Sequence, residues 1–300
     1  MTEEKIHYYS LSKYLKENFG GKVYKVALDG GFTCPNRDGA IDTRGCIFCS
    51  AGGSGEFAQN REMSISKQIE SGIELVKKKV PQSGMVGYVA YFQAFTNTYG
   101  DLDDLRAKYT EALNNKNVVA VSIATRPDCL SEGVLDLLEE LNKVKPIWVE
   151  LGLQTAKKET ADYIRRGYSL DVFDCAVENL KKAGIYTIVH VILGLPGETI
   201  DDMLNTVSYV VNSGVKGIKL QLLHVLKGTD LEEEYKQGKF RTLELDEYVN
   251  IICECLKIIP DDVVVHRLTG DGDRRLLVAP LWSLNKKNVL NEMAKKITPD

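Results

Sequence analysis

Hydrophobic and polar positions follow two alternating periods along the chain. Short apolar runs rich in Val, Ile and Leu alternate with longer stretches in which apolar residues recur every three or four positions. The short runs are typical of buried strands and the longer stretches of amphipathic helices. The strands are expected at residues 22–28, 85–92, 118–124, 147–153, 186–193 and 217–223, and the helices at residues 64–80, 102–114, 131–142, 169–183 and 200–212.

Regular alternation of strands and helices predicts an α/β fold with a parallel sheet and the helices outside it. Six such units fall short of the eight of a closed barrel, so we expect an open, TIM-like partial (β/α)6 barrel with a wide lateral mouth. An amphipathic helix over residues 1–20 precedes it and ends at Gly20 and Gly21. The expected segments are a helical extension (1–21), the barrel (22–226) with a cysteine loop (29–55), and a C-terminal extension (227–300).

The C-terminal extension has a different pattern. A polar connection is followed by a helix that ends at Ile259, a strand at 263–268 and a basic terminal region. Basic residues interleaved with an aromatic residue can clamp phosphates and stack a base, whereas solvated charges around a core tryptophan explain the same residues equally. We expect the extension to pack against the barrel mouth. The residues in question are Arg267, Arg274, Arg275, Trp282, Lys286 and Lys287.

Composition narrows the class of protein. With 300 residues, of which 44% are hydrophobic, the chain can build a sizeable core. No apolar run approaches the roughly 20 residues of a membrane span, and the charged N-terminus lacks the apolar region of a signal peptide, so we expect a cytoplasmic protein. A formal charge of −4 argues against a surface coated in phosphate-binding residues, although a local basic channel stays compatible with it.

Three of the seven cysteines lie in one glycine-rich loop, and they are the main candidates for chemistry. Eleven residues separate Cys34 from Cys46, and Cys46 and Cys49 form a CxxC. A structural zinc ion needs four protein ligands, and no histidine lies between His7 and His190. A 4Fe–4S cluster held by three thiolates keeps one iron open for a substrate or cofactor. An iron–sulfur cluster is therefore our first interpretation, with zinc and no metal as alternatives.

The other four cysteines lack metal-ligand spacing, and a disulfide framework is not expected in a reducing compartment. Cys253 and Cys255 form a CxC pair in a helical pattern, where residues two apart point to different faces. We interpret all four as core cysteines. They are Cys129, Cys175, Cys253 and Cys255.

Polar residues gather at the predicted carboxyl ends of the strands, where barrels place their active sites. A single polar residue in a strand is usually a satisfied core group, but recurrence at corresponding ends of several strands predicts a site. The residues concerned are 93–98, 125–128, Glu150, Gln154, His190, 194–197, Lys219, Gln221 and His224.

The motifs resemble the radical S-adenosylmethionine (SAM) superfamily. PNRDG, YFQAFTNTYG, SIATRPDCL, VELGLQTA, HVILGLPGET, LHVLKGTDLEEEYKQG and RLTGDGDRRLLVAPLW together are similar to its bacterial YhcC or YtqA family. Most of the superfamily has three residues between the first two cysteines, and the longer spacing here resembles the branch of the Elongator catalytic subunit. The resemblance implies a 4Fe–4S cluster, SAM cleavage to a 5′-deoxyadenosyl radical, and an electron donor such as flavodoxin or ferredoxin.

The resemblance also implies roles for residues. Cys34, Cys46 and Cys49 match the cluster ligands. The segment after the second strand stands where relatives bind the SAM amino group. Ala124 stands where the coproporphyrinogen dehydrogenase branch has a ribose-binding glutamate, so this role does not carry over, and Arg126 and Glu150 are the candidates to substitute for it. The implied SAM-binding residues are Gln93, Thr96, Asn97, Thr98, Arg126, Glu150, Gln154, Arg166 and His190.

Three of these features have simpler explanations. Arg166 can be a solvated cation at a helix end. Glu150 lies in an otherwise apolar strand, where an unpaired carboxylate is costly, so we expect a polar partner or a ligand. The GLPGE stretch is either a plain turn or a helix N-terminus that faces the adenine or ribose.

Three functions remain open from the sequence. The first is a radical SAM enzyme acting on a nucleic acid, with tRNA favoured slightly by analogy with Elongator. The second is a radical SAM enzyme acting on a small metabolite or a protein. The third is a non-enzymatic iron–sulfur or zinc protein, which leaves the polar strand ends unexplained. The oligomeric state is not predicted.

Overall fold

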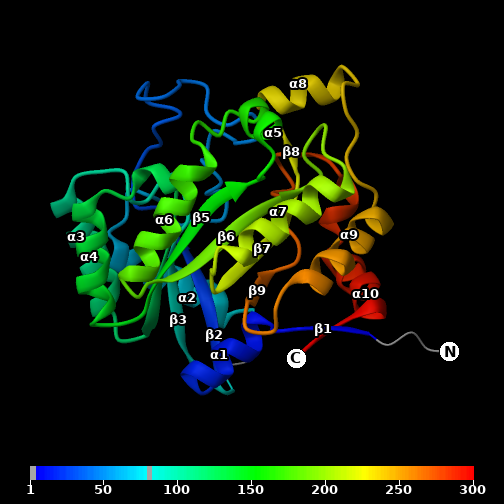
Figure 1. Ribbon diagram of the computed structural model, residues 1–300. Coiled ribbons are helices and arrows are strands. Elements are labelled where there is room, and N and C mark those ends of the chain that lie inside the picture. Colours follow the sequence, from blue (N-terminus) through cyan, green and yellow to red (C-terminus); the bar gives the residue numbers. More distant parts are fainter. Residues whose placement is uncertain (1–4, 80–82) are drawn as a thin grey trace.

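A curved sheet of seven parallel strands forms the centre of the computed structural model, which describes residues 5–79 and 83–300 (Figure 1). The strand order is β2-β3-β4-β5-β6-β7-β9, so strands that follow one another in the chain lie side by side. The predicted α/β half-barrel is confirmed. The strands are β2 (Lys22–Leu28), β3 (Met85–Phe92), β4 (Val118–Thr125), β5 (Ile147–Gln154), β6 (Tyr186–Leu193), β7 (Gly217–Leu222) and β9 (Val264–Arg267).

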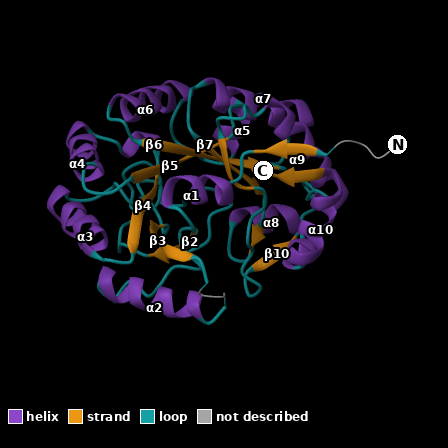
Figure 2. Ribbon diagram, turned by 90° about the horizontal axis from the view of Figure 1, so that it is seen from below, coloured by secondary structure: helices purple, strands orange, loops and turns teal. Residues whose placement is uncertain are grey.

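Helices cover the outer face of the sheet (Figure 2). Their apolar sides and the outward-facing strand residues form one large core. Most begin at a polar cap: Ser64 accepts a hydrogen bond from the Lys67 amide, and Thr199 and Asp202 form a capping box. The outer helices are α2 (Ile65–Lys77), α3 (Leu102–Asn114), α4 (Glu132–Asn142), α6 (Leu170–Lys182), α7 (Ile200–Asn212) and α9 (Leu245–Ile258). The predicted end of the first of these, at Val80 before Pro81, lies outside the described residues.

The sheet has one strand more than the six predicted. The strand expected in the C-terminal extension is β9, and it pairs in parallel with β7, with Gly217 opposite Val264. Two helices lie between β7 and β9 in the chain, and this long connection hid the pairing from sequence periodicity. The C-terminal extension therefore contributes an edge strand to the barrel sheet.

The N-terminal segment also differs from the prediction of one helix over 1–20. Within the described residues it contains a short strand, β1 (Ile6–Tyr8), and a helix, α1 (Leu11–Phe19), which Ser10 caps. Strand β1 pairs in parallel with β11 (Ile297–Pro299), near the other end of the chain. Pairing with a strand so distant in sequence overrides the local helical pattern.

Helix α1 closes the amino-terminal end of the barrel. It lies in the middle of the ring of strands and helices in Figure 2. Leu15 packs there against Val23, Val89 and Trp148, with further aliphatic residues of the strands. The barrel floor is therefore apolar, and polar groups inside the barrel lie nearer the carboxyl ends of the strands.

The rest of the C-terminal region is more structured than the predicted polar connection. Trp282 donates a hydrogen bond to the Leu243 carbonyl (3.0 Å) and packs on Tyr248. No helix in the described ranges has the length and apolar character needed to cross a membrane. The remaining elements are η1 (Pro127–Cys129), α5 (Lys158–Tyr163), β8 (Val225–Leu226), α8 (Asp230–Lys236), β10 (Leu277–Ala279), η2 (Leu281–Leu284) and α10 (Lys286–Lys296).

Candidate functional site

The cysteine loop follows β2 at the carboxyl end of the sheet, and its three cysteines are half-buried residues. Burial and the neighbouring Cys49 raise the pKa of Cys46 to about 12. Burial also raises the pKa of Cys49. The thiols of Cys46 and Cys49 therefore need added positive charge, such as iron, to ionise near neutral pH. Among the described residues, no group of three or more His, Cys, Asp or Glu is arranged around a single metal ion.

Polar side chains of the loop itself fix its path. Asn36 donates hydrogen bonds to the Arg165 carbonyl (2.7 Å) and to the Cys46 sulfur (3.5 Å). Arg37 donates to the carbonyls of Cys49 (2.7 Å) and Ser50 (2.6 Å). The PNRDG motif therefore positions both cysteines of the CxxC, a role that sequence reasoning did not assign to Asn36 or Arg37.

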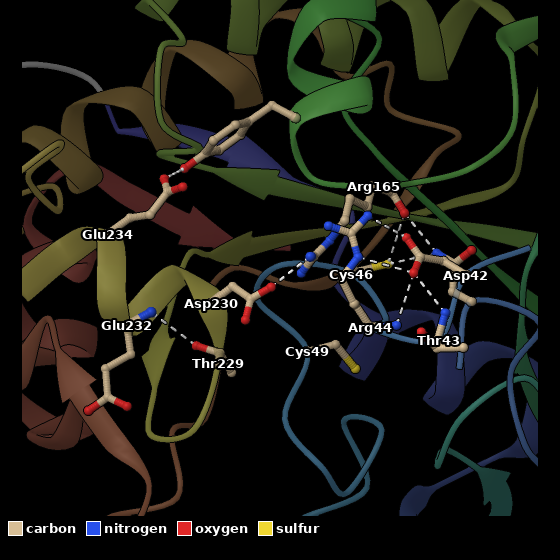
Figure 3. A network of polar contacts seen from close by, with 12 residues as sticks. Asp42, Thr43, Arg44, Cys46, Cys49, Arg165, Thr229, Asp230, Glu232 and Glu234 are labelled. Atoms are coloured by element: carbon tan, nitrogen blue, oxygen red, sulfur yellow. Dashed lines mark hydrogen bonds and ion pairs between the residues drawn. The ribbon is translucent and has the colours of Figure 1, made fainter. Parts of the chain in front are cut away.

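Helix α8 of the C-terminal extension contacts the cysteine loop. Figure 3 shows Cys46 beside Arg165, which pairs with Asp230 on α8 (2.6 Å). The Leu231 amide donates to the Ile47 carbonyl, inside the CxxC (3.1 Å). The CxxC part of the loop is therefore held both by the α5–α6 connection and by α8.

The segment from Gln93 to Thr98 lies between the cysteine loop and the sheet. The Phe95 amide donates to the Gly53 carbonyl (2.9 Å), and Gln93 donates to the Ser54 carbonyl (2.7 Å). The side chains of the last three residues face the protein: Thr96 is buried, Asn97 donates to the carbonyls of Phe92 and Ala124, and the Thr98 hydroxyl lies 2.5 Å from that of Thr125. The segment thus connects the cysteine loop to the sheet.

Tight packing between this segment and the loop predicts that Gly55→Ala disrupts the site. A Cβ at Gly55 would lie 2.5 Å from the Ala94 Cβ and 3.1 Å from the Ala94 Cα. We expect the free energy of unfolding to fall by about 1–3 kcal/mol, and the iron content after reconstitution to fall with it. Gly52→Ala is the matched control, because its Cβ would approach other atoms only to 3.6 Å. Equal behaviour of the two variants would contradict this packing argument.

Backbone strain is concentrated around these segments. In the described part of the chain, four residues other than glycine have a positive φ: Ser54 (64°), Phe95 (60°), Gln154 (70°) and Arg165 (57°). Each belongs to the cysteine loop, the segment after β3, the end of β5 or the turn after α5. Such strain persists where the surroundings enforce it, and it is typical of functional sites.

Four polar atoms near this strain are buried without a partner: Asn36 Oδ1, Asn97 Oδ1, Gln154 Oε1 and Arg165 Nε. An unsatisfied buried polar atom is costly. The side-chain oxygens of Asn97 and Gln154, which lie after β3 and at the end of β5, are therefore candidate acceptors for hydrogen bonds from a bound cofactor.

Two arginines flank the ring of Tyr168 near the end of β5. Arg126 forms two hydrogen bonds with Asp128 (2.9 and 2.7 Å), which raise its pKa despite burial. Arg166 donates to the carbonyls of Leu153, Thr155 and Tyr168, and burial lowers its pKa. The alternative of a solvated helix-end cation is wrong for Arg166, because only 4% of the residue is exposed.

Glu150 lies inside the barrel and is fully paired. Lys25 (2.7 Å) and Ser122 (2.6 Å) donate to its Oε1. Lys219 donates to Oε2, and His190 Nε2 lies 2.7 Å from the same atom. Burial alone would raise the pKa of Glu150, but the two lysines hold it well below its usual range. The prediction that Glu150 needs a polar partner is confirmed.

These contacts bring Glu150, His190 and Lys219 together, as their strand positions predicted, but they also change the expected roles. Four protein donors occupy the acceptor sites of the Glu150 carboxylate. Burial lowers the pKa of His190 to about 4, so the imidazole is neutral at pH 7. His224 is not part of this group; burial lowers its pKa to about 4, and its Nε2 is buried without a partner. Sequence reasoning missed Lys25 and Ser122.

Two protein-family models match this chain and show its family. The model described as the Radical SAM superfamily matches residues 43–210, and the Radical_SAM C-terminal domain matches residues 215–298. The chain belongs to the radical SAM superfamily. The predicted resemblance is thereby confirmed, and membership implies a 4Fe–4S cluster and SAM.

Individual radical SAM relatives agree with this. The chain is 46% identical over 297 residues to YtqA of Bacillus subtilis, covering 99% of this chain and 90% of that protein. It is 28% identical over 181 residues to a tRNA uridine(34) acetyltransferase of Methanocaldococcus infernus, covering 59% of this chain and 33% of that protein. The structure of M. infernus Elp3 lacking its N-terminus has a TM-score of 0.67 and 21% identity, covering 92% of this chain and 63% of that one. This structural likeness shows a shared fold.

Proposed function

We propose that this radical SAM enzyme holds a 4Fe–4S cluster through Cys34, Cys46 and Cys49 and uses it to cleave SAM reductively. When bound, the cluster and SAM supply a 5′-deoxyadenosyl radical that abstracts hydrogen from an unreactive C–H bond. The observation that carries the proposal is the position of the three thiols, on one loop at the carboxyl end of β2, against a strained segment with unpaired acceptors. A flavodoxin or ferredoxin is the proposed electron donor.

Some of the chain's own residues oppose part of the rise in the pKa values of the Cys46 and Cys49 thiols. The positive charge of Arg37 opposes the effect of burial on the pKa of Cys49. Hydrogen bonding from Asn36 and the charge of Arg126 act in the same direction on Cys46. Both effects stabilise negative charge on sulfur before iron is bound.

For SAM we propose contacts from the residues around the thiols. The unpaired oxygens of Asn97 and Gln154 can accept hydrogen bonds from its amino group or ribose hydroxyls. Arg126 and Arg166 place positive charge near the site, as a carboxylate requires. Gln93, Thr96 and Thr98 are proposed to shape the binding segment, whereas the contacts of Glu150 and His190 assign them to the barrel interior.

We further propose that the substrate is tRNA. The support is similarity to a protein named as a tRNA uridine(34) acetyltransferase and to Elp3. A small metabolite or a protein is the second candidate. It is favoured by two of the terminal basic residues, because Arg275 pairs with Asp273 (2.6 Å) and Lys286 with Asp271 (2.6 Å) instead of presenting free charge.

The test is anaerobic reconstitution with iron and sulfide, followed by dithionite and SAM, with 5′-deoxyadenosine as the readout. We expect a slow background of 5′-deoxyadenosine that rises sharply when bulk tRNA is added. A background unaffected by tRNA would contradict the tRNA proposal and direct the search to metabolites and proteins. A protein without a cluster and without 5′-deoxyadenosine would contradict the radical SAM proposal itself and favour a zinc or scaffold protein.

A further inference from the structure

Glu150 and its four donors form one level of the barrel interior, which we call the interior charged layer. It consists of Lys25 on β2, Ser122 on β4, Glu150 on β5, His190 on β6 and Lys219 on β7. Five strands thus place polar side chains around one carboxylate, between the apolar floor over α1 and the carboxyl ends of the strands. Parallel strands bring such positions together because their inward residues recur every second position.

The layer has more basic groups than carboxylates. Lys25 and Lys219 both pair with Glu150, and the ion pairs of the described residues give neither lysine another carboxylate. His190 is neutral at pH 7, as its lowered pKa requires. Burial also lowers the pKa of Lys219, to about 7, so its amino group is only partly protonated at pH 7. Two amino groups that can each carry a positive charge therefore face one carboxylate, and a bound anion would favour the charged form of Lys219.

The structure offsets this excess only in part. Both ammonium groups lie over the ring of Tyr91, at 4.8 Å for Lys25 and 4.6 Å for Lys219. A cation–π contact stabilises a cation less than a second carboxylate would. Each lysine has three N–H donors, and the described hydrogen bonds occupy one on each, to Glu150. Donors and charge thus remain for a ligand.

The layer is reachable from the carboxyl ends of the strands. The Lys25 side chain is 23% exposed and that of His190 is 15% exposed. The next inward positions toward the cysteine loop include Ala27, Ala124 and Gly152, which are small and partly exposed. No bulky side chain at these three positions separates the layer from the proposed SAM site.

We propose that the interior charged layer binds an oxyanion group of the substrate, a carboxylate or a phosphate, through Lys25 and Lys219. An oxyanion would balance the second positive charge and accept the unused N–H donors. Glu150 would act as a positioning residue that holds the two ammonium groups in place. That the anion belongs to the substrate rests on the proposed function, whereas anion binding by the layer does not require SAM cleavage.

The experiment uses the full, cluster-loaded chain under anaerobic conditions without SAM. Its thermal midpoint is measured against increasing acetate or inorganic phosphate, with chloride adjusted to keep the ionic strength constant. We expect a saturable rise in Tm with one of the two probes. Acetate identifies a carboxylate group and phosphate a phosphate group. If neither acetate nor phosphate gives a saturable rise in Tm, the proposal is overturned.

Two variants locate the effect. Lys25→Met keeps the size of the side chain and removes the charge, and we expect affinity for the effective probe to fall by about tenfold or more. Lys22→Met is the matched control, because Lys22 is exposed on the same strand, and it should keep the wild-type response. Unchanged affinity in Lys25→Met would also overturn the proposal.

The two proposals can fail separately. In the same preparations, 5′-deoxyadenosine formation reports on the radical SAM function. Saturable anion binding without 5′-deoxyadenosine would contradict the proposed function and leave the layer's binding intact. SAM cleavage without saturable anion binding would support the proposed function and contradict anion binding by the layer.

Discussion

Cys46→Ala is expected to abolish cluster assembly and, with it, all cleavage of SAM. Three thiolates are the minimum set that leaves one iron open, so the loss of one leaves the cluster without sufficient protein ligands. The measurement is iron and sulfide content per chain after anaerobic reconstitution, together with 5′-deoxyadenosine formed with dithionite and SAM. The same result is expected for Cys34→Ala and Cys49→Ala.

The control is Cys175→Ala. Cys175 lies on α6 and is exposed, so the interpretation of this residue as a core cysteine is wrong. Its hydrogen-bonding neighbour is the Asn179 amide (3.5 Å). This variant should assemble a normal cluster and cleave SAM at the wild-type rate. If Cys46→Ala retained a normal cluster and full cleavage, the ligand assignment would be wrong.

Glu150→Gln is expected to lower the free energy of unfolding by about 3–5 kcal/mol. The substitution keeps the shape of the side chain but removes the only carboxylate that pairs with Lys25 and Lys219 among the described residues. The buried Lys219 and the partly exposed Lys25 would then lie together without a carboxylate, and one of them would have to lose its proton or draw in water. Urea unfolding of the full chain, followed by circular dichroism, measures the change.

A surface pair provides the control for Glu150. Glu139 pairs with Lys143 (3.2 Å), and both side chains are about half exposed or more. Glu139→Gln should therefore cost less than about 1 kcal/mol. In the double variant Glu150→Gln with Lys219→Met, part of the lost stability should return, because one unpaired cation is removed. A loss of under about 1 kcal/mol for Glu150→Gln alone would show that the layer does not depend on this charge.

Sequence periodicity predicted the long strands and helices of the barrel well, because each of them buries a continuous apolar face. It failed where tertiary pairing decides the structure. Residues 6–8 form a strand only because residues 297–299 lie beside them. Val264–Arg267 was recognised as a strand, but its place at the sheet edge depends on the path of α8 and α9.

The candidate site was likewise predictable from the sequence only in part. The spacing of Cys34, Cys46 and Cys49 carries a chemical signal that survives without a structure. Glu150 could be singled out because a carboxylate in an apolar strand needs a partner. Lys25 could not, because it occupies an ordinary polar position in KVYKVAL and its partner is 125 residues away. Whether an arginine such as Arg166 points to solvent or to carbonyls is likewise decided only by packing.

The pairing of β1 with β11 has a consequence for synthesis on the ribosome. Ile6 emerges early, but its partner Ile297 is made only after every strand of the barrel sheet has been translated. Until residue 297 has been made, β1 is therefore an unpaired edge strand next to α1, the helix that closes the barrel floor. Chains that are released early, upstream of residue 297, would lack this pairing and expose that edge to other nascent chains, a recognised route to aggregation.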